Sequence, residues 1–510
     1  MKPQVMPNIL FLELTNVCNM HCTFCPSDLL NRKRQHMSPR HVQRFLQQIH
    51  ALGIRPPILC NVLGEPLLNR QVFHYLDLFA QYGHPVTVIT NMTRLTDQTV
   101  LKRLLQYPNL TIALSLQTPT KQSYKMRGYS SLPFADFFAL VFQAIEQKFT
   151  QQSPVRLEVH IASNYILCHD PNLQTDIPLR LWPMFPSYKK EARWAKRFLD
   201  SLETFAQQVS MTYPDFYAQE MTRCQELYHE HIGPRLALKR AHLPADFIHL
   251  KGEDFWGYMF LPNVLLQFKS FELWTKDRAF LKSLMPKDSF LYIEERATPL
   301  ACPMAGNLGM LANGDLIFCC LDYEGEMKLG NIETADIQAL LSSPKRARLQ
   351  ENVVTEPLCR RCKGTVFVLG TNPLHRRKQS IDTYGSGWHP YEKDLHGIGG
   401  RWTNGRAVSY VYTRIRARAI VIRCASERDV SCTLALYAYN EADGSFSREC
   451  LTSFSAAKKQ LTVKETAHNF QVSRLYKIVL ASPAFVPAEL QSDGDTRRLG
   501  VAVFAMYLKK

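Results

Sequence analysis

The chain has 510 residues and a formal net charge of +16 at pH 7, with 46% hydrophobic and 21% charged residues. This composition excludes an intrinsically disordered chain, and the apolar runs are too short for a membrane-spanning helix of about 20 residues. A chain of this length is expected to form roughly two to four domains. The N-terminus has no signal-peptide pattern, so we expect a cytoplasmic protein.

The basic residues are scattered in short runs rather than gathered in one patch: 31–34, 360–363 and 375–378. Such runs are typical of solvated faces, and we expect no nucleic-acid partner. The 14 cysteines carry more information. Tight cysteine clusters in a chain without a secretion signal indicate metal or redox chemistry.

Apolar runs and amphipathic stretches alternate along the first third of the chain. The runs with the length of a buried strand are 8–14, 57–62, 85–91, 110–116 and 155–162. The stretches with a helical period are 39–53, 70–83, 97–107 and 133–149. Strands that alternate with helices predict a parallel sheet. With 246–252 as a sixth strand, we expect an α/β fold built on a partial parallel (β/α)6 barrel.

The regular alternation stops after the fifth run. Residues 166–245 are rich in charged and aromatic side chains and contain a helical pattern at 187–231, which predicts a helical insertion. We expect this insertion to cover the barrel mouth. Beyond the second cysteine group, alternating apolar runs between Gly and Asp turns predict an antiparallel β-sandwich. The expected domains are a barrel at 1–299, a small cysteine domain at 300–368, a linker at 369–387 and a sandwich at 388–510.

Cys18, Cys22 and Cys25 fall within eight residues, directly after the first apolar run. Thiolates at this C-x3-C-x2-C spacing bind iron–sulfur clusters or zinc. A structural zinc ion takes four protein ligands, so three thiolates favour a cluster with one iron left open for a small chelating ligand. A zinc site or a disulfide is the alternative interpretation of the spacing alone.

The motif resembles the cluster-binding loop of the radical S-adenosylmethionine superfamily, in which C-x3-C-x-aromatic-C follows the first strand of a parallel βα barrel. The second strand of this chain ends in "LGEP", with Leu63 where the family commonly has Gly. The resemblance implies that this segment binds the methionine amino group of the cofactor. It also implies that polar residues at the next strand ends line the same site. The cofactor-binding residues implied in this way are Gly64, Glu65, Pro66, Asn91, Ser115 and Gln117.

The resemblance implies a reaction as well. A 4Fe–4S cluster, reduced by a flavodoxin- or ferredoxin-like partner, cleaves S-adenosylmethionine to methionine and a 5′-deoxyadenosyl radical, which abstracts hydrogen from a substrate. For Asn91, Ser115 and Gln117, a role as ordinary polar residues at strand ends is the alternative interpretation. Arg127, in "YKMRGYS", is a further candidate to hold a carboxylate, with a surface position as its alternative.

The second cysteine group consists of Cys302, Cys319 and a C-x-x-C pair at Cys359 and Cys362. The segment "NGDLIFCCLD" predicts a hairpin that delivers thiols, and four thiols form a closed site for zinc or an iron–sulfur cluster. The pattern Cys-x11-Gly-x4-Cys followed by Cys-x2-Cys resembles the auxiliary-cluster extension of radical enzymes, called SPASM in its long form and twitch in its short form. The long form has three further cysteines after the C-x-x-C pair, whereas the next cysteine of this chain is Cys424, inside the expected sandwich. The resemblance therefore implies the twitch form with one auxiliary 4Fe–4S cluster. Cys320 is assigned no ligand role.

Short motifs with Trp388, Glu392, Arg401 and Trp402 resemble a small β-sandwich domain of some bacterial enzymes of surface-polysaccharide pathways. The tryptophans would either stack on sugar rings or anchor the sandwich core. A closed cluster is suited to accept an electron from a substrate, which favours oxidation. We therefore expect a radical enzyme of the oxidoreductase or epimerase type that acts on a carbohydrate-like small molecule. The alternatives are a maturase of a ribosomally made peptide or protein, a tRNA- or nucleic-acid-modifying enzyme, and an iron–sulfur protein without catalysis.

Overall fold

The computed structural model describes residues 6–129, 131–163, 188–228, 248–251, 255–270, 281–282, 290–370, 378–381, 383–392, 395, 399–486 and 497–510. The chain forms two compact units. Unit 1 contains Met1–Leu284 and Glu295–Gly364, and unit 2 contains Met285–Glu294 and Thr365–Lys510. Among the helices that the structure describes, none has the apolar length that a bilayer span requires.

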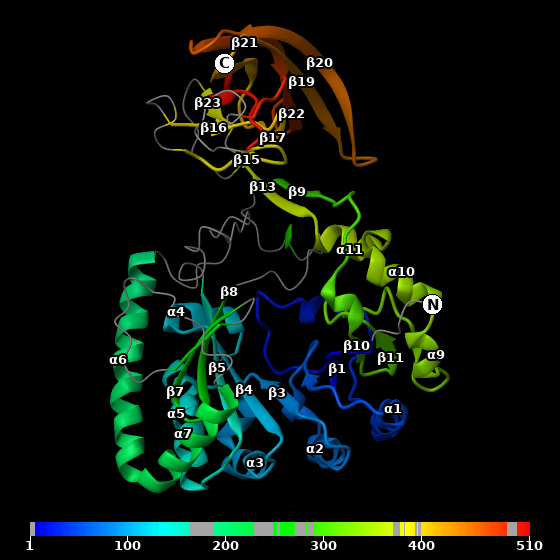
Figure 1. Ribbon diagram of the computed structural model, residues 1–510, viewed down its shortest axis with the longest axis vertical. Coiled ribbons are helices and arrows are strands. Elements are labelled where there is room, and N and C mark those ends of the chain that lie inside the picture. Colours follow the sequence, from blue (N-terminus) through cyan, green and yellow to red (C-terminus); the bar gives the residue numbers. More distant parts are fainter. Residues whose placement is uncertain are drawn as a thin grey trace. The chain divides into compact units, whose positions relative to one another are not determined.

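Unit 1 is built on a mixed sheet of 11 strands (Figure 1). Its parallel strands are, in spatial order, β10 (Leu308–Met310), β1 (Leu10–Leu12), β2 (Ile58–Cys60), β3 (Val86–Thr90), β4 (Leu110–Gln117), β5 (Arg156–Ser163) and β8 (Val264–Ser270). Antiparallel strands follow at both ends of the order, so the sheet is open. The predicted α/β fold with a partial parallel barrel is confirmed.

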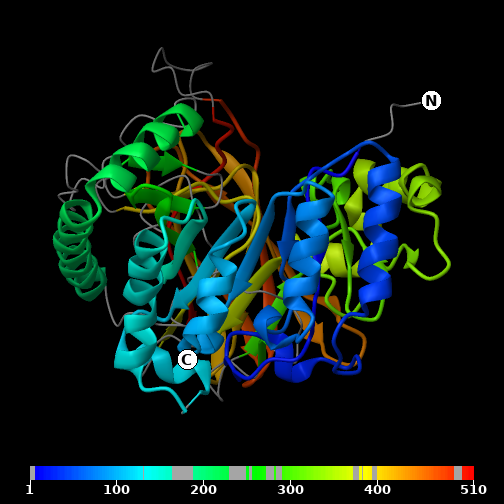
Figure 2. The ribbon, with the colours of Figure 1, turned by 90° about the horizontal axis from the view of Figure 1, so that it is seen from below.

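Helices cover one face of the parallel strands (Figure 2). They are α1 (Pro39–Ala51), α2 (Val72–Gln81), α3 (Gln98–Leu104) and α5 (Phe134–Thr150), each close to its predicted range. Ser38 and Asp97 cap α1 and α3 by accepting backbone N–H bonds. The apolar side of each helix packs on the strands.

The sixth parallel strand is β8 rather than the predicted run at 246–252, so that prediction is wrong. The residues of this run that form a strand are β6 (Ile248–Lys251), which pairs antiparallel with β7 (Phe255–Leu261) at the edge of the sheet. A tight turn reverses the chain between β7 and β8, with Asn263 in the left-handed region at φ 56°. This hairpin brings the buried run of β8 beside β5.

The insertion is helical as predicted, with α6 (Tyr188–Thr212) and α7 (Pro214–Tyr228). Helix α7 lies at the end of the barrel where the strands begin: Glu220 is 3.8 Å from Lys148, at the end of α5, and accepts a 2.9 Å bond from Asn263. In α6, by contrast, Trp194 packs beside Phe24 and Ala162 near the carboxyl ends of the strands. The expectation that the insertion covers the barrel mouth is therefore wrong for α7.

The predicted cysteine hairpin is present in unit 1. Strand β10 and β11 (Asp315–Ile317) are antiparallel, and Gly314 forms the turn at φ 86°. The chain then continues through β12 (Gly330–Asn331), α9 (Ile337–Leu341), α10 (Pro344–Glu351) and α11 (Pro357–Cys362). Because β10 pairs with β1, this cysteine hairpin extends the barrel sheet.

Unit 2 contains two antiparallel five-stranded sheets whose inner faces share one apolar core, as the predicted sandwich requires. One sheet contains β14 (Lys378–Ser380), β23 (Ala502–Lys509), β18 (Ala417–Ala425) and β21 (Thr462–Phe470), with β16 (Arg401–Trp402) also on β23. The other contains β15 (Thr383–Tyr384), β17 (Arg406–Tyr412), β22 (Leu475–Ala481), β19 (Val430–Asn440) and β20 (Ser445–Ala456).

Two expected boundaries need correction. The range 369–387 is not simply a linker, because it supplies β14 and β15. Strands β9 (Phe290–Glu294) and β13 (Thr365–Leu369), expected in the barrel and cysteine domains, pair with each other and belong to unit 2. Their aromatic side chains pack on those of β17 and β19, and the Tyr410 hydroxyl donates to the Glu294 carboxylate at 2.7 Å.

The two tryptophans of the sandwich have structural contacts. Trp402 is buried and packs edge-on against Phe485. Trp388 is partly buried, and its Nε1 donates to the Val408 carbonyl oxygen at 2.7 Å. The anchoring interpretation therefore holds for Trp402, and sugar stacking on this side chain is excluded.

Candidate functional site

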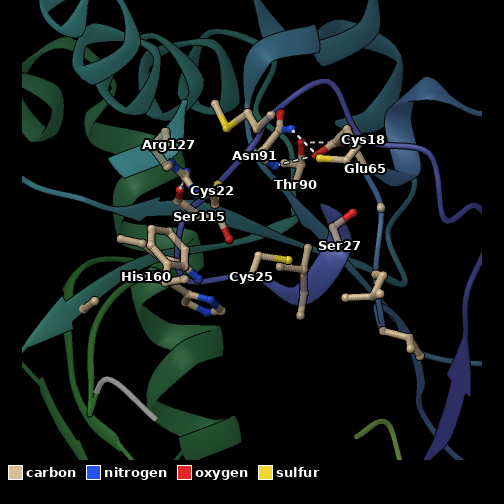
Figure 3. Close-up of a pocket in the computed structure, with 18 of the residues that line it drawn as sticks. Cys18, Cys22, Cys25, Ser27, Glu65, Thr90, Asn91, Ser115, Arg127 and His160 are labelled. Atoms are coloured by element: carbon tan, nitrogen blue, oxygen red, sulfur yellow. Dashed lines mark hydrogen bonds between the residues drawn. The ribbon is translucent and has the colours of Figure 1, made fainter. Parts of the chain in front are cut away.

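The carboxyl ends of β1 to β5 surround a cavity of ≈ 380 Å³ (Figure 3). This volume lies within the range of roughly 300–1,000 Å³ that is usual for small-molecule sites. The cavity lining includes all but one of the predicted residues of the barrel: Cys18, Cys22, Cys25, Gly64, Glu65, Asn91, Ser115 and Gln117. Pro66, which begins the short helix η2 (Pro66–Leu68), is not part of the lining.

The cysteine loop is fixed by backbone hydrogen bonds to the segment after β4. The N–H groups of His21 and Thr23 donate to the carbonyl oxygens of Arg127 and Met126 at 3.1 and 2.8 Å. Gly128 lies against this loop, and a Cβ atom there would be 2.5 Å from the His21 carbonyl oxygen. The His21 ring is exposed, and its Nδ1 lies 3.0 Å from Asp28 Oδ1.

Burial holds these three thiols in their protonated form while nothing is bound to them. It raises the pKa of Cys18 to about 11 and that of Cys25 to about 12. Burial also raises the pKa of Cys22, although the nearby Arg127 guanidinium acts in the opposite direction. A metal centre that binds here must therefore displace protons from buried thiols, which makes loading dependent on pH.

Glu65 contributes a fully buried carboxylate to the cavity. Its Oε1 accepts bonds from the Thr90 hydroxyl at 2.8 Å and the Leu67 N–H at 3.1 Å, and its Oε2 accepts from the Asn91 N–H at 2.6 Å. Burial outweighs these donors and raises the pKa of Glu65 to about 7. Such a carboxylate favours a bound donor or cation beside it.

The "LGEP" segment requires glycine at one position. Gly64 has φ +83°, and a Cβ atom there would be 2.2 Å from the Thr15 carbonyl oxygen. Leu63, which departs from the family pattern, is buried against Phe11, Leu311 and Ile317. Leu63 therefore packs with the hairpin of the second cysteine group and adds an apolar surface to the cavity wall.

Asn91 turns its side chain toward the cysteine loop. Its Nδ2 donates to Asn19 Oδ1 at 2.9 Å and lies 3.7 Å from Cys18 Sγ. Its Oδ1 accepts bonds from the backbone and hydroxyl of Thr93 at 3.0 and 2.7 Å. With both ends of its amide engaged, Asn91 holds a fixed position in the cavity wall beside Cys18.

The end of β4 and the turn after it bring a cation into the cavity. Arg127 is buried, donates from Nη2 to the Ser115 carbonyl oxygen, and has Nη1 at 3.9 Å from Cys22 Sγ. Its Nε has no hydrogen-bond partner in the part of the chain that the structure describes. Gln117 adopts φ 40°, a left-handed conformation at the strand end. The Arg127 guanidinium can therefore receive an anionic group, and the surface alternative is excluded.

Sequence analysis missed His160, which lines the same cavity and is buried. His160 Nε2 is 3.0 Å from Glu158 Oε2, and Arg156 Nη2 is 2.9 Å from Glu158 Oε1. These side chains share one face of β5 because they alternate along the strand. The signal in the sequence was the polar residue at every second position of "RLEVH" within an otherwise apolar run.

The second cysteine group gathers in a separate apolar core of unit 1. Cys302, Cys319 and Cys359 pack around the same buried side chains, and burial raises the pKa of Cys359 to about 12. The neighbouring thiols of Cys319, Cys362 and Cys302 add to this rise. Cys320 packs instead in a different cluster, on the side of Cys25.

Both thiol groups have the chemistry of cluster sites. The described residues contain no set of three His, Cys, Asp or Glu side chains drawn together tightly enough for one metal ion. Three thiols open to a cavity fit a cluster with a free coordination position. Four neighbouring thiols, of which Cys302, Cys319 and Cys359 pack in an apolar core, fit a closed one.

The fold and the site thus define an iron–sulfur protein with a small-molecule cavity at its strand ends. Residues 12–155 match the family model described as "Radical SAM superfamily", and residues 302–363 match SPASM, described as "Iron-sulfur cluster-binding domain". The chain therefore carries a radical SAM domain followed by a SPASM iron–sulfur domain. These domains bind a 4Fe–4S cluster with S-adenosylmethionine and auxiliary iron–sulfur clusters, respectively.

Solved structures with a similar arrangement include BtrN in complex with AdoMet and 2-DOIA (13% identity, 71% of this chain and 94% of that chain, TM-score 0.34). SuiB of Streptococcus suis bound to its precursor peptide SuiA is similar over 68% of this chain and 67% of that chain, at 13% identity and TM-score 0.37. The structure of anSMEcpe with bound AdoMet is similar over 70% of this chain and 85% of that chain, at 13% identity and TM-score 0.35. At these TM-scores the likeness does not bear on the substrate. No curated protein matches the sequence.

Proposed function

We propose that Cys18, Cys22 and Cys25 hold the radical 4Fe–4S cluster and that S-adenosylmethionine binds beside it in the cavity. The observation that carries this proposal is that the three thiols and the buried Glu65 carboxylate line one space at the strand ends. Bound there, the cluster and its cofactor supply a 5′-deoxyadenosyl radical.

In this proposal, different residues around the thiols bind different groups of the cofactor. Glu65 accepts hydrogen bonds from the amino group of the methionine part, and Arg127 holds its carboxylate through the guanidinium that faces the cavity. Gly64 lets the backbone approach closely, and Ser115 and Gln117 bind polar groups at the end of β4. Asn91 positions Cys18 through its amide, so we assign it to the cluster loop rather than to the cofactor.

The four thiols of Cys302, Cys319, Cys359 and Cys362 hold one auxiliary 4Fe–4S cluster in this proposal. Four thiolates coordinate all four iron atoms, so no iron has an open position for a substrate. In its apolar surroundings such a cluster is suited to accept an electron. That property favours a net oxidation over an epimerisation, because an epimerised substrate gives up no electron in total.

Oxidation of an alcohol to a ketone removes a hydrogen atom from carbon, a proton from the hydroxyl group and one electron. His160 is the base in the cavity wall that takes the proton, and Glu158 fixes the ring and stabilises its charged form. Arg156 in turn holds Glu158. The cavity thus has a cofactor side, with the thiols and Glu65, and a substrate side with His160. We propose a polyhydroxylated, carbohydrate-like substrate for this side.

The test uses the holoenzyme prepared without oxygen, with both cluster sites loaded, S-adenosylmethionine, and dithionite or a flavodoxin as reductant. Candidate sugars and polyols deuterated at carbon are supplied one at a time. The proposal predicts deuterium in 5′-deoxyadenosine and a product that has lost two hydrogens. A product that has only exchanged its deuterium for hydrogen, and is one mass unit lighter than the substrate, would show epimerisation. Deuterium transfer from peptides alone would show that the peptide alternative is right.

A further inference from the structure

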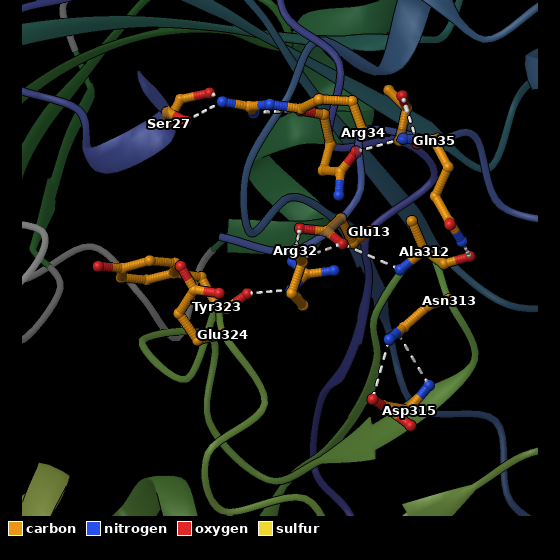
Figure 4. Close-up of polar contacts among 12 residues, drawn as sticks. Glu13, Ser27, Arg32, Arg34, Gln35, Ala312, Asn313, Asp315, Tyr323 and Glu324 are labelled. Carbon is orange, nitrogen blue, oxygen red and sulfur yellow. Dashed lines mark hydrogen bonds and ion pairs between the residues drawn. The ribbon is translucent and has the colours of Figure 1, made fainter. Parts of the chain in front are cut away.

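Glu13 is a buried acid at the end of β1 that takes no part in the cavity. It is 0% exposed, and Figure 4 shows its contacts with Arg32 and Ala312. Arg32 Nη2 donates to both of its carboxylate oxygens, at 2.8 and 3.0 Å, and the Ala312 N–H donates at 2.9 Å. The backbone N–H of Leu63 also acts on this carboxyl group and lowers its pKa. One side chain therefore joins the loop after the thiols, the auxiliary hairpin and the segment before Gly64.

Arg32 connects this acid to the turn that follows the auxiliary thiols. Its Nε donates to the Tyr323 carbonyl oxygen at 2.6 Å. The neighbouring Asn31 N–H donates to the Glu324 carboxylate at 2.9 Å, and Gln35 Nε2 donates to the Ala312 carbonyl oxygen at 3.0 Å. The segment 31–35 is thus bonded along the hairpin and turn that carry Cys319.

The same segment is also bonded to the first thiol loop. Arg34 Nη1 donates to Ser27 Oγ at 3.1 Å and to the Asn16 carbonyl oxygen at 2.8 Å. Ser27 lies two residues after Cys25. Segment 31–35 therefore has one set of contacts at each cluster site, and the ion pair of Glu13 and Arg32 lies between them.

A buried ion pair holds its surroundings firmly, because the loss of one partner leaves the other charge without compensation. Burial raises the pKa of Glu13, while the Arg32 guanidinium and the backbone N–H groups of Ala312 and Leu63 counteract that rise. A shift of the turn after Cys319 would move Arg32, and with it Glu13 and the N–H of Leu63. The segment that follows Leu63 is Gly64–Glu65, which lines the cavity.

We propose that Glu13 and Arg32 are positioning residues that couple the auxiliary cluster site to the cofactor cavity. A cluster bound by the second thiol group fixes the turn at Tyr323. The ion pair of Glu13 and Arg32 is then held in place, and it keeps Gly64 and Glu65 in position at the cavity. S-Adenosylmethionine then binds more tightly when the auxiliary site is loaded. By linkage, bound S-adenosylmethionine protects the auxiliary cluster to the same degree. The proposal requires both cluster sites but is independent of the substrate.

The test is a double-mutant cycle on the full chain reconstituted without oxygen. The affinity for S-adenosylmethionine is measured from the change in the EPR signal of the reduced cluster during titration. Cys359→Ala with Cys362→Ala removes the auxiliary cluster and is expected to weaken binding about tenfold, within the usual range of coupling between sites. Glu13→Gln is expected to weaken binding to a similar degree. Once Glu13→Gln is present, removal of the auxiliary cluster is expected to change the affinity less than twofold.

Two further variants keep the result interpretable. Lys33→Met removes a charge from an exposed side chain in the same segment, and it should retain both the affinity and the tenfold effect of auxiliary-cluster loss. Arg32→Lys keeps the charge but loses the two-oxygen contact and the Nε donor, and it replaces Glu13→Gln if the latter unfolds below the assay temperature. Effects that multiply to about a hundredfold in the combined variant would overturn the proposal. So would an unchanged affinity after loss of the auxiliary cluster alone.

Discussion

The two thiol groups of unit 1 differ in their surroundings. Cys18, Cys22 and Cys25 share a cavity with the polar side chains of Glu65, Arg127 and His160. The second group packs among apolar side chains, including Phe318, Leu349 and Val353. In the proposed function this difference separates two tasks: the open group binds the cluster that activates a small molecule, and the closed group binds a cluster that exchanges electrons.

Loss of one open-group thiol is the change with the largest expected effect. Cys22→Ala should remove about four iron atoms per chain, since a 4Fe–4S cluster depends on each of its three ligands, and should abolish formation of 5′-deoxyadenosine. Iron and sulfide analysis with product quantification measures both. Cys450→Ser, on β20 of unit 2, is the control that should leave iron and activity unchanged. Full iron content in Cys22→Ala would assign the cluster to other residues.

The substrate side of the open site is tested by His160→Gln. Loss of a positioned base typically lowers a rate by about 10²–10⁴-fold, so formation of the oxidised product should fall by at least about 100-fold. Cleavage of S-adenosylmethionine should continue, because His160 is assigned to the substrate side of the cavity. The ratio of product to 5′-deoxyadenosine gives the answer. His84→Gln changes a buried histidine outside the cavity and should keep the wild-type ratio. Equal losses of both products in His160→Gln would contradict its role as a base.

The buried carboxylate predicts how the stability of unit 1 depends on pH. The Glu65 carboxyl ionises near 4.5 in the unfolded chain but near 7 when folded. Its contribution to stability is therefore full below pH 4.5 and is lost as the pH rises to about 7. At ~1.4 kcal/mol per pKa unit, the loss is about 3 kcal/mol.

The measurement compares wild type with Glu65→Gln, both free of clusters, by urea unfolding between pH 4 and 8. The advantage of wild type over the variant should shrink by about 3 kcal/mol across this range. A difference that stays constant with pH would mean that Glu65 ionises normally.

A smaller effect is expected from two glycine substitutions at positive φ, of which only one is in close contact with another segment. Gly64→Ala should weaken S-adenosylmethionine binding by about 10–100-fold, because strain of about 1–3 kcal/mol moves the segment away from Thr15. Gly53→Ala has a similar positive φ of +71° but no atom within 4 Å of the added Cβ, and it should keep the wild-type affinity. Equal affinities of the two variants would show that the contact with Thr15 is unimportant.

Local patterns predicted the barrel well because the apolar run of each strand and the helical period that follows it lie within a short stretch of sequence. The helix expected at 133–149 is α5, Phe134–Thr150, and its apolar positions alone define it. The sixth parallel strand was misplaced because the run at 264–270 was not recognised as a strand. The direction of β6 depends on its pairing with β7, which the sequence pattern does not contain. Strands β14 and β15 are three and two residues long, too short for any periodic signal.

For the site, too, the features contained in a local motif were predicted, whereas those that depend on contacts between distant segments were not. Three cysteines on one loop are visible in the sequence, as are the glycine and glutamate of "LGEP". His160 was missed because its role depends on which face of β5 borders the cavity. The bond between Glu13 and Ala312 spans 299 positions of the chain, so no local pattern contains it.

The contrast between the open and the closed thiol group is tested most directly by EPR spectroscopy of two complementary variants. One lacks Cys359 and Cys362 and retains only the open-group cluster; the other has Ala in place of Cys18, Cys22 and Cys25. Addition of S-adenosylmethionine to the reduced proteins should change the signal of the first variant and leave that of the second unaltered. A cofactor-dependent change in the second variant, or none in the first at saturating cofactor, would contradict the assignment of the two sites.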